Sequence, residues 1–466
     1  MKIGLIGGSY QQRSLPFDAQ RSINLFPVFD EQGKEVASLY GTPGLSLFTN
    51  TGSGMTRACF SSSNGRAFTV SGTELYEVFS GGTSTLRGTL DTFSTNITIE
   101  ENLTQMAICD GTSLYIFTYA TNTIAKVTDA DFPTSVGTVT YVNGYFIVNQ
   151  NDTGRFYISA LNDGTSWAAL DFATAETAPD RLLRVIRLSG QLCLFGERST
   201  EVWTNTGDSS FPFQRISGAE MPEGILSPYS AIEIGSSVYW LGSSVGGNGI
   251  VYRTNGFTPE RISTEAIEVF ISRATDKENI KSMSYQKDGH LFYILTGGGL
   301  ETTLVFDATT QVWHERSYNN NGLHETHLMG GLMFAFGKHL VGDRIGGTVY
   351  EMGEAFYSDN GVEIKRERVF THLSNENKPN RYNSLELGFE SGVGLQSGQG
   401  ENPKVLLQLS KDGARTWSGN YLASLGRVGK YQTRVVFRRL GIANQMTFRI
   451  IITDPVKVCI TGAYLE

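Results

Sequence analysis

The chain repeats one pattern of apolar and polar positions along most of its length. An alternating apolar run meets a turn with glycine, a second run rich in aromatic residues follows, and a third run comes after a polar gap. Alternation at period two predicts β-strands, and the glycine predicts a tight turn between them. The turn glycines are Gly65, Gly111, Gly144, Gly190, Gly235, Gly289 and Gly337.

The spacing of these glycines predicts the architecture. Successive glycines are separated by 46, 33, 46, 45, 54 and 48 residues, and a period of about 45 fits the four-stranded blade of a β-propeller. One blade can bury only one of its faces, so blades stack around an axis to complete the core. We expect a closed propeller of six or seven blades, because the 33-residue spacing is short for four strands.

One strand-to-strand connection is marked clearly. Residues 304–313 read as an apolar strand, a turn from Asp307 to Gln311, and a strand that carries Trp313. Asp and Thr are typical of tight turns because their side chains hydrogen-bond to nearby backbone groups. These residues predict a β-hairpin.

A helical pattern interrupts the strands at residues 263–281. Ser263 or Thr264 can cap its first turn, and Glu265 and Glu268 suit the positive end of a helix dipole. An apolar stripe at helical spacing follows, formed by Ile267, Phe270 and Ile271. We expect this helix to be a crossover that packs on the side of the propeller.

The pattern changes after Gly353, and so does the charge. Residues 356–466 carry 15 Lys and Arg against 10 Asp and Glu, a net charge of +5, whereas residues 1–355 carry −13. Five runs of period two follow, at residues 384–389, 404–409, 433–437, 446–452 and 456–461. Such runs predict a β-sandwich. We therefore expect three parts: an extended N-terminal segment (1–56), a β-propeller (57–353) and a β-sandwich (354–466).

Composition supports an all-β protein and restricts its setting. The 466 residues include 53 glycines, only 18% are charged and 11% are aromatic, which favours short strands with tight turns over helical bundles or disorder. The net charge of −8 argues against an electrostatic binder of nucleic acid or anionic membrane. The four scattered cysteines predict buried free thiols. No signal peptide or apolar membrane span is recognisable, so we expect synthesis in a reducing cytosol and no membrane anchor.

Two segments resemble the Asp box of sialidases and related propellers. Residues 410–417 read Ser-Lys-Asp-Gly-Ala-Arg-Thr-Trp, and residues 162–167 read Asn-Asp-Gly-Thr-Ser-Trp. In such a box the carboxylate, here Asp412, accepts backbone N–H groups, Gly413 takes a positive φ and Trp417 covers the turn. The box is a structural turn, so it is weak support for glycan hydrolysis.

A cluster of imidazoles raises the question of a metal site. His314, His324, Glu325 and His327 lie close together in the sequence, and a His-x-x-His pair can present two ligands to a metal. The surrounding residues read as a loop and lack the helix that orients such pairs, so we expect a solvated loop. We find no nucleophile elbow or activated cysteine, and predict no catalytic, cofactor-binding or metal-binding residues and no enzyme activity.

A basic run lies in the C-terminal part and leaves two alternatives open. Its members are Arg427, Lys430, Arg434, Arg438 and Arg439. They can form a solvated strand face, or they can contact an acidic partner or DNA phosphates.

Several short blocks, in order along the chain, resemble a family of phage tail proteins. Near the start these are Ser-Ile-Asn-Leu-Phe-Pro at 22–27 and Gly-Thr-Pro-Gly-Leu at 41–45. The middle contributes residues 194–203 and the helix, and the end contributes residues 410–413, 434–441 and 453–456. Together they resemble the packaged-DNA stabilisation proteins, also called tail hub or nozzle proteins, of short-tailed bacteriophages.

The resemblance implies a structural role in the virion tail, with assembly in the host cytoplasm. Members of the family form a ring of six subunits, a homo-hexamer, below the portal and its adaptor ring. The ring continues the DNA channel, helps retain packaged DNA and anchors the tail needle or plug and the tailspikes or fibres. Duplex DNA would pass through the lumen without specific binding, and we expect Arg434, Arg438 and Arg439 to serve protein contacts. The alternative is a glycan-binding or glycan-cleaving propeller that acts in receptor recognition.

Overall fold

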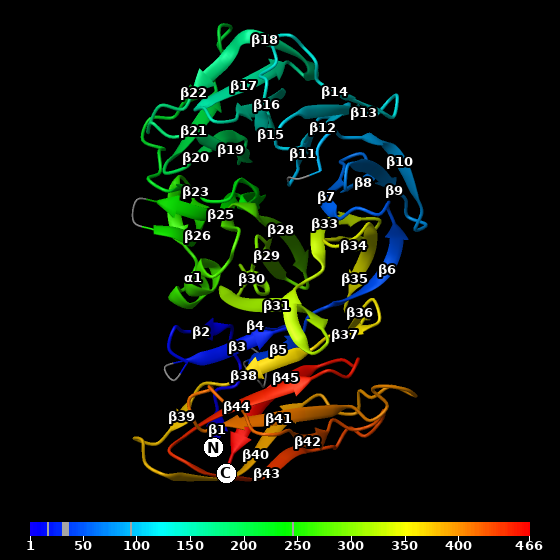
Figure 1. Cartoon of the computed structure of the whole chain (residues 1–466), viewed down its shortest axis with the longest axis vertical. Coiled ribbons are helices and arrows are strands. Elements are labelled where there is room, and N and C mark those ends of the chain that lie inside the picture. The colour runs from blue at the N-terminus through cyan, green and yellow to red at the C-terminus, as the bar shows by residue number, and fades with distance from the viewer. Residues whose placement is uncertain (16–17, 30–36, 94–95, 245–246) are drawn as a thin grey trace.

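A computed structural model describes residues 1–15, 18–29, 37–93, 96–244 and 247–466. The chain is all-β, with 56% strand and 3% helix. A ring of sheets occupies one end of the long axis and a smaller pair of sheets occupies the other (Figure 1). The expected all-β fold, a propeller followed by a C-terminal β-sandwich, is confirmed.

The ring consists of antiparallel four-stranded units. The first four units are β7 (Thr56–Ser61), β8 (Ala67–Ser71), β9 (Glu74–Val78) and β10 (Ser84–Thr89); β11 (Thr98–Glu101), β12 (Gln105–Cys109), β13 (Leu114–Thr118) and β14 (Thr123–Lys126); β15 (Val136–Val142), β16 (Tyr145–Gln150), β17 (Arg155–Ala160) and β18 (Asp163–Thr174); and β19 (Leu182–Leu188), β20 (Gln191–Gly196), β21 (Thr200–Asn205) and β22 (Phe213–Arg215).

The next units complete the circle. The fifth unit contains β25 (Ser237–Ser244), β26 (Gly247–Asn255) and β27 (Thr258–Arg261), and both β23 (Gly224–Ile225) and β24 (Ile232–Ile234) pair with the inner edge of β25. The sixth contains β28 (Ile280–Lys287), β29 (His290–Gly297), β30 (Thr303–Asp307) and β31 (Val312–Asn320). The last contains β33 (Met329–Ala335), β34 (Lys338–Asp343), β35 (Thr348–Gly353) and β6 (Gly44–Asn50). Within the described residues, the strand pairing therefore divides the ring into seven units.

The ring is closed by a strand from the N-terminal segment. Strand β6 pairs antiparallel with β35, with Gly44 opposite Gly353 and Asn50 opposite Thr348. The innermost strands β7, β11, β15, β19, β24, β28 and β33 contact one another in cyclic order. Residues 1–56 are thus more than an extended segment, because part of them completes the last unit of the propeller.

The turn glycines all adopt positive φ, between 63° and 93°. Six of them connect the first and second strands of a unit, as the repeat predicts, but Gly111 connects the second and third strands, β12 and β13. The β11–β12 turn has no glycine; the Asn102 side chain accepts the N–H groups of Thr104 (2.8 Å) and Gln105 (2.7 Å) instead. The short spacing of 33 residues therefore reflects a displaced glycine and not a missing strand.

The predicted hairpin at Asp307 to Gln311 is confirmed by the pairing of β30 with β31. The helix is shorter than predicted: α1 spans Glu265–Ser272, and only the 3-10 turn η2 (Lys277–Asn279) follows. Thr264 is the cap, and its Oγ1 accepts the N–H of Ile267. The helix ends early because the backbone of Asp276 donates to Gly298 O (2.9 Å) and joins the next unit.

The β-sandwich places two sheets face to face around an apolar core. One sheet contains β4 (Leu25–Phe29), β5 (Ala37–Gly41), β45 (Cys459–Leu465), β40 (Asn380–Phe389) and β43 (Val435–Ala443), and the other contains β38 (Arg366–Val369), β44 (Gln445–Ile452), β41 (Lys404–Ser410) and β42 (Tyr421–Ser424). Alternate residues, such as Leu385, Leu407 and Ile450, meet in the core. All five predicted runs overlap strands of these sheets.

The four cysteines are free thiols, and Cys109, Cys193 and Cys459 are buried, as predicted. Burial raises the pKa of the Cys109 thiol to about 12, so this thiol stays protonated near neutral pH. Within the described residues, no helix has the length and apolar character needed to cross a membrane.

Candidate functional site at the propeller–sandwich junction

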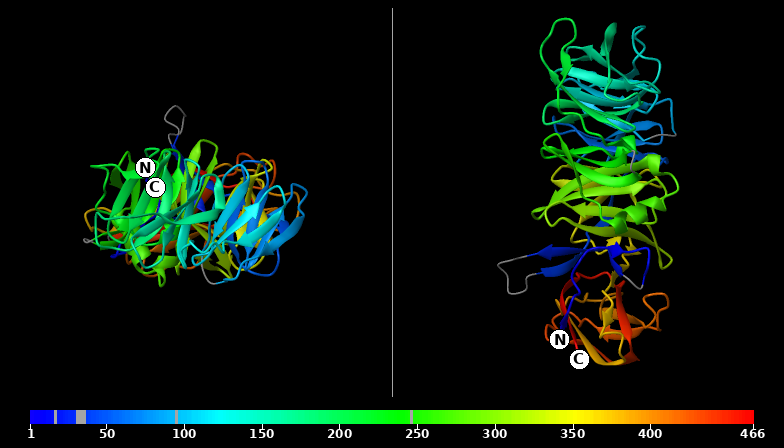
Figure 2. Two further views of the ribbon diagram at one scale, coloured as in Figure 1. Left: turned by 90° about the horizontal axis from the view of Figure 1, so that it is seen from above. Right: turned by 90° about the vertical axis from the view of Figure 1, so that its left-hand side faces the viewer.

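One N-terminal strand joins the propeller to the sandwich. Strand β3 (Ala19–Ile23) pairs in parallel with the propeller strand β31, with Ile23 opposite Glu315. On its other edge it pairs antiparallel with β38, with Ile23 opposite Glu367. A continuous sheet therefore runs from β28 in the propeller to β42 in the sandwich. Strands β3 and β4 lie between the propeller and the sandwich in Figure 1, and the N-terminal strands are seen at the same level in the right view of Figure 2.

Glu315 is the buried anion on the propeller side of this joint. Its side chain is 2% exposed and accepts hydrogen bonds from Arg21 Nε (3.0 Å), Thr302 Oγ1 (2.7 Å) and Ser9 Oγ (2.8 Å). Burial alone would raise the pKa of Glu315, but the Arg21 charge and these hydrogen bonds outweigh it and hold the pKa below its ordinary value. The pair is charged, and both carboxylate oxygens of Glu315 accept hydrogen bonds, as a buried ion pair requires.

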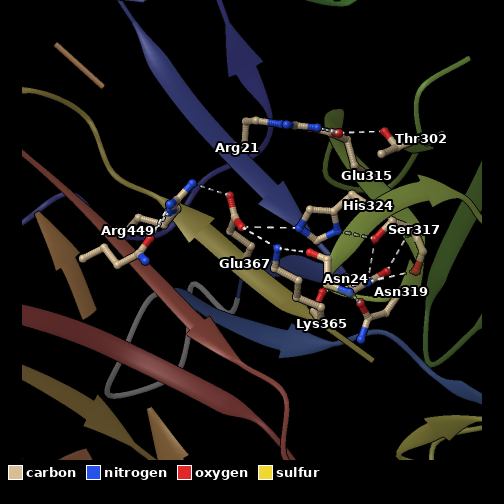
Figure 3. Close-up of polar contacts among 12 residues, drawn as sticks. Arg21, Asn24, Thr302, Glu315, Ser317, Asn319, His324, Lys365, Glu367 and Arg449 are labelled. Carbon is tan, nitrogen blue, oxygen red and sulfur yellow. Dashed lines mark hydrogen bonds and ion pairs between the residues drawn. The ribbon is translucent and has the colours of Figure 1, made fainter. Parts of the chain in front are cut away.

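Glu367 is the matching anion on the sandwich side (Figure 3). Its Oε2 lies 3.3 Å from His324 Nε2 and 3.8 Å from Lys365 Nζ, and its Oε1 lies 3.9 Å from Arg449 Nη1. Burial favours the neutral acid, but the hydrogen bond from His324 and the nearby cations keep the pKa of Glu367 below its usual range. His324 is on the propeller and Arg449 is on β44, so one carboxylate contacts both domains.

The side-chain amide of Asn24, directly after β3, hydrogen-bonds to β31 and to Lys365, the residue before β38. Its Nδ2 donates to Ser317 O (3.1 Å) and Lys365 O (2.9 Å), and its Oδ1 accepts the Ser317 N–H (2.9 Å). The residue is 1% exposed and has φ of 55°, a conformation that asparagine tolerates better than most residues. It is the asparagine of the block at residues 22–27, which the sequence analysis used only as a resemblance.

Buried arginines fill the rest of the junction. Arg368 donates to Leu5 O (2.6 Å), Gly8 O (2.8 Å) and Gln20 Oε1 (2.8 Å), and burial lowers its pKa to about 10. Arg316 Nη2 donates to Pro43 O (2.7 Å), within the second N-terminal block. These arginines bind the N-terminal segment by its carbonyl oxygens.

The second N-terminal block is fitted closely against the junction. An added Cβ at Gly44 would lie 2.5 Å from the carbonyl oxygens of Phe356 and Ser358, and one at Gly41 would lie 2.9 Å from Arg366 Nε. Only glycine leaves room for this approach. These residues were not predicted as a site from the sequence. One signal of buried charge was available: residues 365–368 read Lys-Arg-Glu-Arg. Successive residues of a strand face opposite sides, so some of these charged side chains must lie on the buried face.

The prediction of a solvated loop at His314, His324 and His327 is wrong. His314 lies on β31 and is fully buried, His324 lies on β32 (Leu323–Thr326) beside Glu367, and His327 is buried 3.7 Å from Asp359. Burial, together with the nearby Arg316, lowers the pKa of His314 to about 3, so this imidazole is neutral. Among the described residues, no group of three His, Cys, Asp or Glu side chains could hold a metal ion.

Both Asp-box-like segments are structural turns. Asp412 Oδ1 accepts the N–H groups of Arg415 (3.1 Å) and Thr416 (3.0 Å), and hydrogen bonds from Thr416 and Ser410 hold the pKa of Asp412 well below its usual range. Gly413 has φ of 72°. The Trp417 ring packs against the Arg449 guanidinium, whose Cζ lies 4.2 Å from the ring centre. Asp163 closes the other turn by accepting the Thr165 N–H (3.0 Å).

The three arginines expected at an interface lie at the surface of the sandwich. The Arg434 side chain is 72% exposed and forms a bidentate ion pair with Glu386 on β40 (2.8 and 2.6 Å). Arg438 and Arg439 are consecutive and both exposed, because Arg439 has φ of 61° and the register of β43 against β40 shifts beside it. This bulge places two charges side by side where regular alternation would bury one.

The fold and junction together define a two-domain propeller–sandwich protein. A family model of the bacteriophage P22 Gp10 beta-propeller matches residues 1–357, and one of the P22 Gp10 beta-sandwich matches residues 365–466. The chain therefore belongs to the bacteriophage P22 Gp10 family, and the resemblance to phage tail hub and stabilisation proteins is confirmed. It is a Gp10-like structural protein of a phage tail.

Comparison with other proteins adds two observations. No curated protein sequence matches the chain. Among solved structures, the extracellular domain of BT4673 from B. thetaiotaomicron is similar over 75% of this chain and 45% of its own, with 12% identity and a TM-score of 0.44. The N-terminal domain of Nup159 is similar over 72% of this chain and 98% of its own, with 10% identity and a TM-score of 0.41. The chain thus spans less than half the length of the first of these structures.

Proposed function

We propose that the chain is the subunit of the tail hub, or nozzle: a six-membered ring below the portal and its adaptor ring. In this role it continues the DNA channel, helps retain packaged DNA and anchors the tail needle or plug and the tailspikes or fibres. The observation that carries the proposal is the pair of family matches, which together cover both domains of the chain. Assembly of the ring in the host cytoplasm is part of the same proposal.

The junction supports a role in resisting mechanical force. A ring that retains pressurised DNA must resist movement between its parts, and domains joined only by a flexible linker would move independently. Here strand β3 pairs with both domains, and the buried carboxylates Glu315 and Glu367 pair with partly exposed arginines on either side of the junction. The two domains are therefore coupled by backbone pairing and by buried charge.

The charge distribution supports separate roles for the two domains. A DNA channel that allows rapid ejection should bind phosphates weakly, because each neutralised phosphate strengthens binding by counterion release. The net charge of −13 on residues 1–355 suits a weakly repelling wall, and the +5 on residues 356–466 suits contact with acidic neighbours. We assign Arg434, Arg438 and Arg439 to protein contacts within the tail.

Charge reversal tests this assignment. We expect phage that carry Arg434→Glu, Arg438→Glu and Arg439→Glu together to lose their genome or to fail in adding the tail, because the ring no longer docks. Wild-type protein should form a six-fold annulus by negative-stain microscopy and should not bind duplex DNA tightly at physiological salt. Tight, salt-sensitive DNA binding that the triple variant loses would show that these arginines hold DNA.

A second triple variant controls for charge alone. Lys404, Lys411 and Arg415 are exposed residues of the other sheet of the sandwich and its Asp-box turn. Their replacement by glutamate changes the net charge by the same amount, and we expect normal phage.

We also propose that the chain has no enzyme activity; turnover of a receptor glycan that is lost on replacing a carboxylate would contradict this.

A further inference from the structure

The innermost strands of the propeller bring three cations to the central channel. Arg57 comes from β7, Arg184 from β19 and Lys281 from β28, three separate units of the ring. They line a cavity of about 390 Å3, together with Tyr229 and Glu100. Residues far apart in the sequence thus meet in one basic pocket, although the propeller segment as a whole is acidic.

Among the described residues, two buried donor atoms of Arg184 have no hydrogen-bond partner. Its relative exposure is 8%, and among the described residues no hydrogen-bond acceptor reaches its buried Nε and Nη1 atoms. A buried guanidinium without acceptors is costly, since it has lost water and gained nothing in exchange. Burial lowers the pKa of Arg184, and the nearby Glu100 opposes this effect. Burial in turn raises the pKa of Glu100 to about 7, so this carboxyl group is only partly ionised at neutral pH.

The neighbouring cations are held in place by backbone groups. Arg57 Nη1 donates to Thr92 O (2.6 Å) and Gly72 O (3.1 Å), and Lys281 Nζ donates to Arg57 O (3.5 Å) and to Gly330 O. Burial lowers the pKa of Lys281 to about 8, which leaves it mostly protonated at pH 7. Arg187, also in the pocket wall, is already neutralised by Glu233 at 2.9 Å. The pocket therefore presents preorganised positive charge with unfilled donors.

We propose that the central channel of the propeller binds a phosphate group, with Arg184 as its principal donor and Lys281 and Arg57 supplying further positive charge. A phosphate oxyanion accepts hydrogen bonds from a planar guanidinium and is attracted by an ammonium group. The cavity is larger than one phosphate, so the group can belong to free phosphate or to a nucleotide. This channel runs through a single propeller and is distinct from the DNA channel proposed for the six-subunit ring, so the proposal is independent of the role in the tail.

Titration calorimetry of the full chain with two probes, inorganic phosphate and deoxyadenosine 5′-monophosphate, tests it. We expect both to bind wild-type protein. Equal affinities would identify free phosphate as sufficient, and tighter nucleotide binding would show that the channel also contacts the attached nucleoside. Arg184→Gln should weaken binding of either probe by about tenfold or more, the usual size of a lost charge-assisted hydrogen bond.

A second variant gives the opposite change, which misfolding cannot imitate. Glu100→Gln removes the competing negative charge and should tighten phosphate binding about threefold or more, by analogy with other partly buried charge pairs. Arg198→Gln, an exposed arginine of the same unit, should bind as wild type does. Without phosphate, Arg184→Gln should unfold at a temperature no lower than wild type. Absence of binding to wild-type protein at millimolar probe, or unchanged binding by Arg184→Gln, would overturn the proposal.

Discussion

Asn24 and Ser317 hydrogen-bond to each other in both directions across the junction. The Asn24 amide donates to Ser317 O at 3.1 Å and accepts the Ser317 N–H at 2.9 Å. A side chain thus imitates the paired hydrogen bonds of a neighbouring strand, at the point where β3 leaves β31 and the chain turns toward β4. The same amide reaches Lys365 O, so one residue satisfies backbone groups from three segments.

We predict that Asn24→Ala destabilises the protein. The substitution leaves buried groups of Ser317 and Lys365 without partners and keeps alanine at a positive φ, and together these effects should cost about 3 kcal/mol. Asn360→Ala is the matched control, since Asn360 is exposed and has a similar φ of 50°. We expect the control to cost about 1 kcal/mol. Chemical unfolding measures both, and equal losses would show that the amide contributes nothing.

We predict that the contribution of Glu315 to stability is lost in acid. Its folded pKa lies below its ordinary value, so the charged form stabilises the fold above the unfolded pKa of about 4.3, and this contribution disappears as pH falls through the folded pKa. Glu315→Gln should therefore lower the free energy of unfolding at pH 7 by about 3 kcal/mol, the usual scale for breaking a buried ion pair.

The comparison across pH isolates this carboxylate. The difference between wild type and Glu315→Gln should shrink as unfolding is measured at progressively lower pH, from 7 to below about 4. Glu260→Gln breaks the exposed pair with Arg253 and should cost less than about 1 kcal/mol at every pH. A difference for Glu315→Gln that does not change with pH would show that the charge is not responsible.

We predict that Gly44→Ala weakens closure of the ring. The new methyl group would meet the carbonyl oxygens of Phe356 and Ser358 at 2.5 Å, and the resulting displacement of β6 from this segment, which directly follows β35, should cost about 2 kcal/mol, as overpacking usually does. Gly81→Ala is the control, because nothing lies within 4 Å of its Cβ position. Thermal unfolding should show a lower midpoint for Gly44→Ala alone. A normal midpoint would mean that the contact is easily relieved.

The strands could be predicted from sequence better than the junction could. Alternation and turn glycines are local signals, and they located the propeller repeat and all five runs of the sandwich. The position of Gly111 left the number of blades open between six and seven, because a turn can be closed by an asparagine side chain as well as by glycine, as Asn102 shows. The histidines misled for a different reason. They flank a polar, asparagine-rich stretch that resembles a loop, and the N-terminal strand that contacts the chain beside it, at Ser317, is about 300 residues distant in sequence.

The site itself could not be derived from spacing. Glu315 finds Arg21 at a separation of 294 residues, and neither residue differs locally from a surface charge. The run at residues 365–368 was the one sequence signal that charges were buried, because consecutive strand residues face opposite sides. The cations of the central channel were equally hidden, since they come from three units whose relative placement only the closed ring determines.

The position of the N-terminal strands fixes an order of events during synthesis. Strand β6 pairs with β35, β3 pairs with β31 and β38, and Met1 donates its amino group to Leu465 O (2.7 Å), so the segments made first find their partners last. At about 5 to 20 residues per second, some 300 residues take roughly 15 to 60 s to translate. During that time β3 and β6 have unpaired edges, which are templates for pairing with other chains. Completion of the propeller and attachment of the sandwich are therefore late steps, and the nascent chain is most vulnerable to aggregation before them.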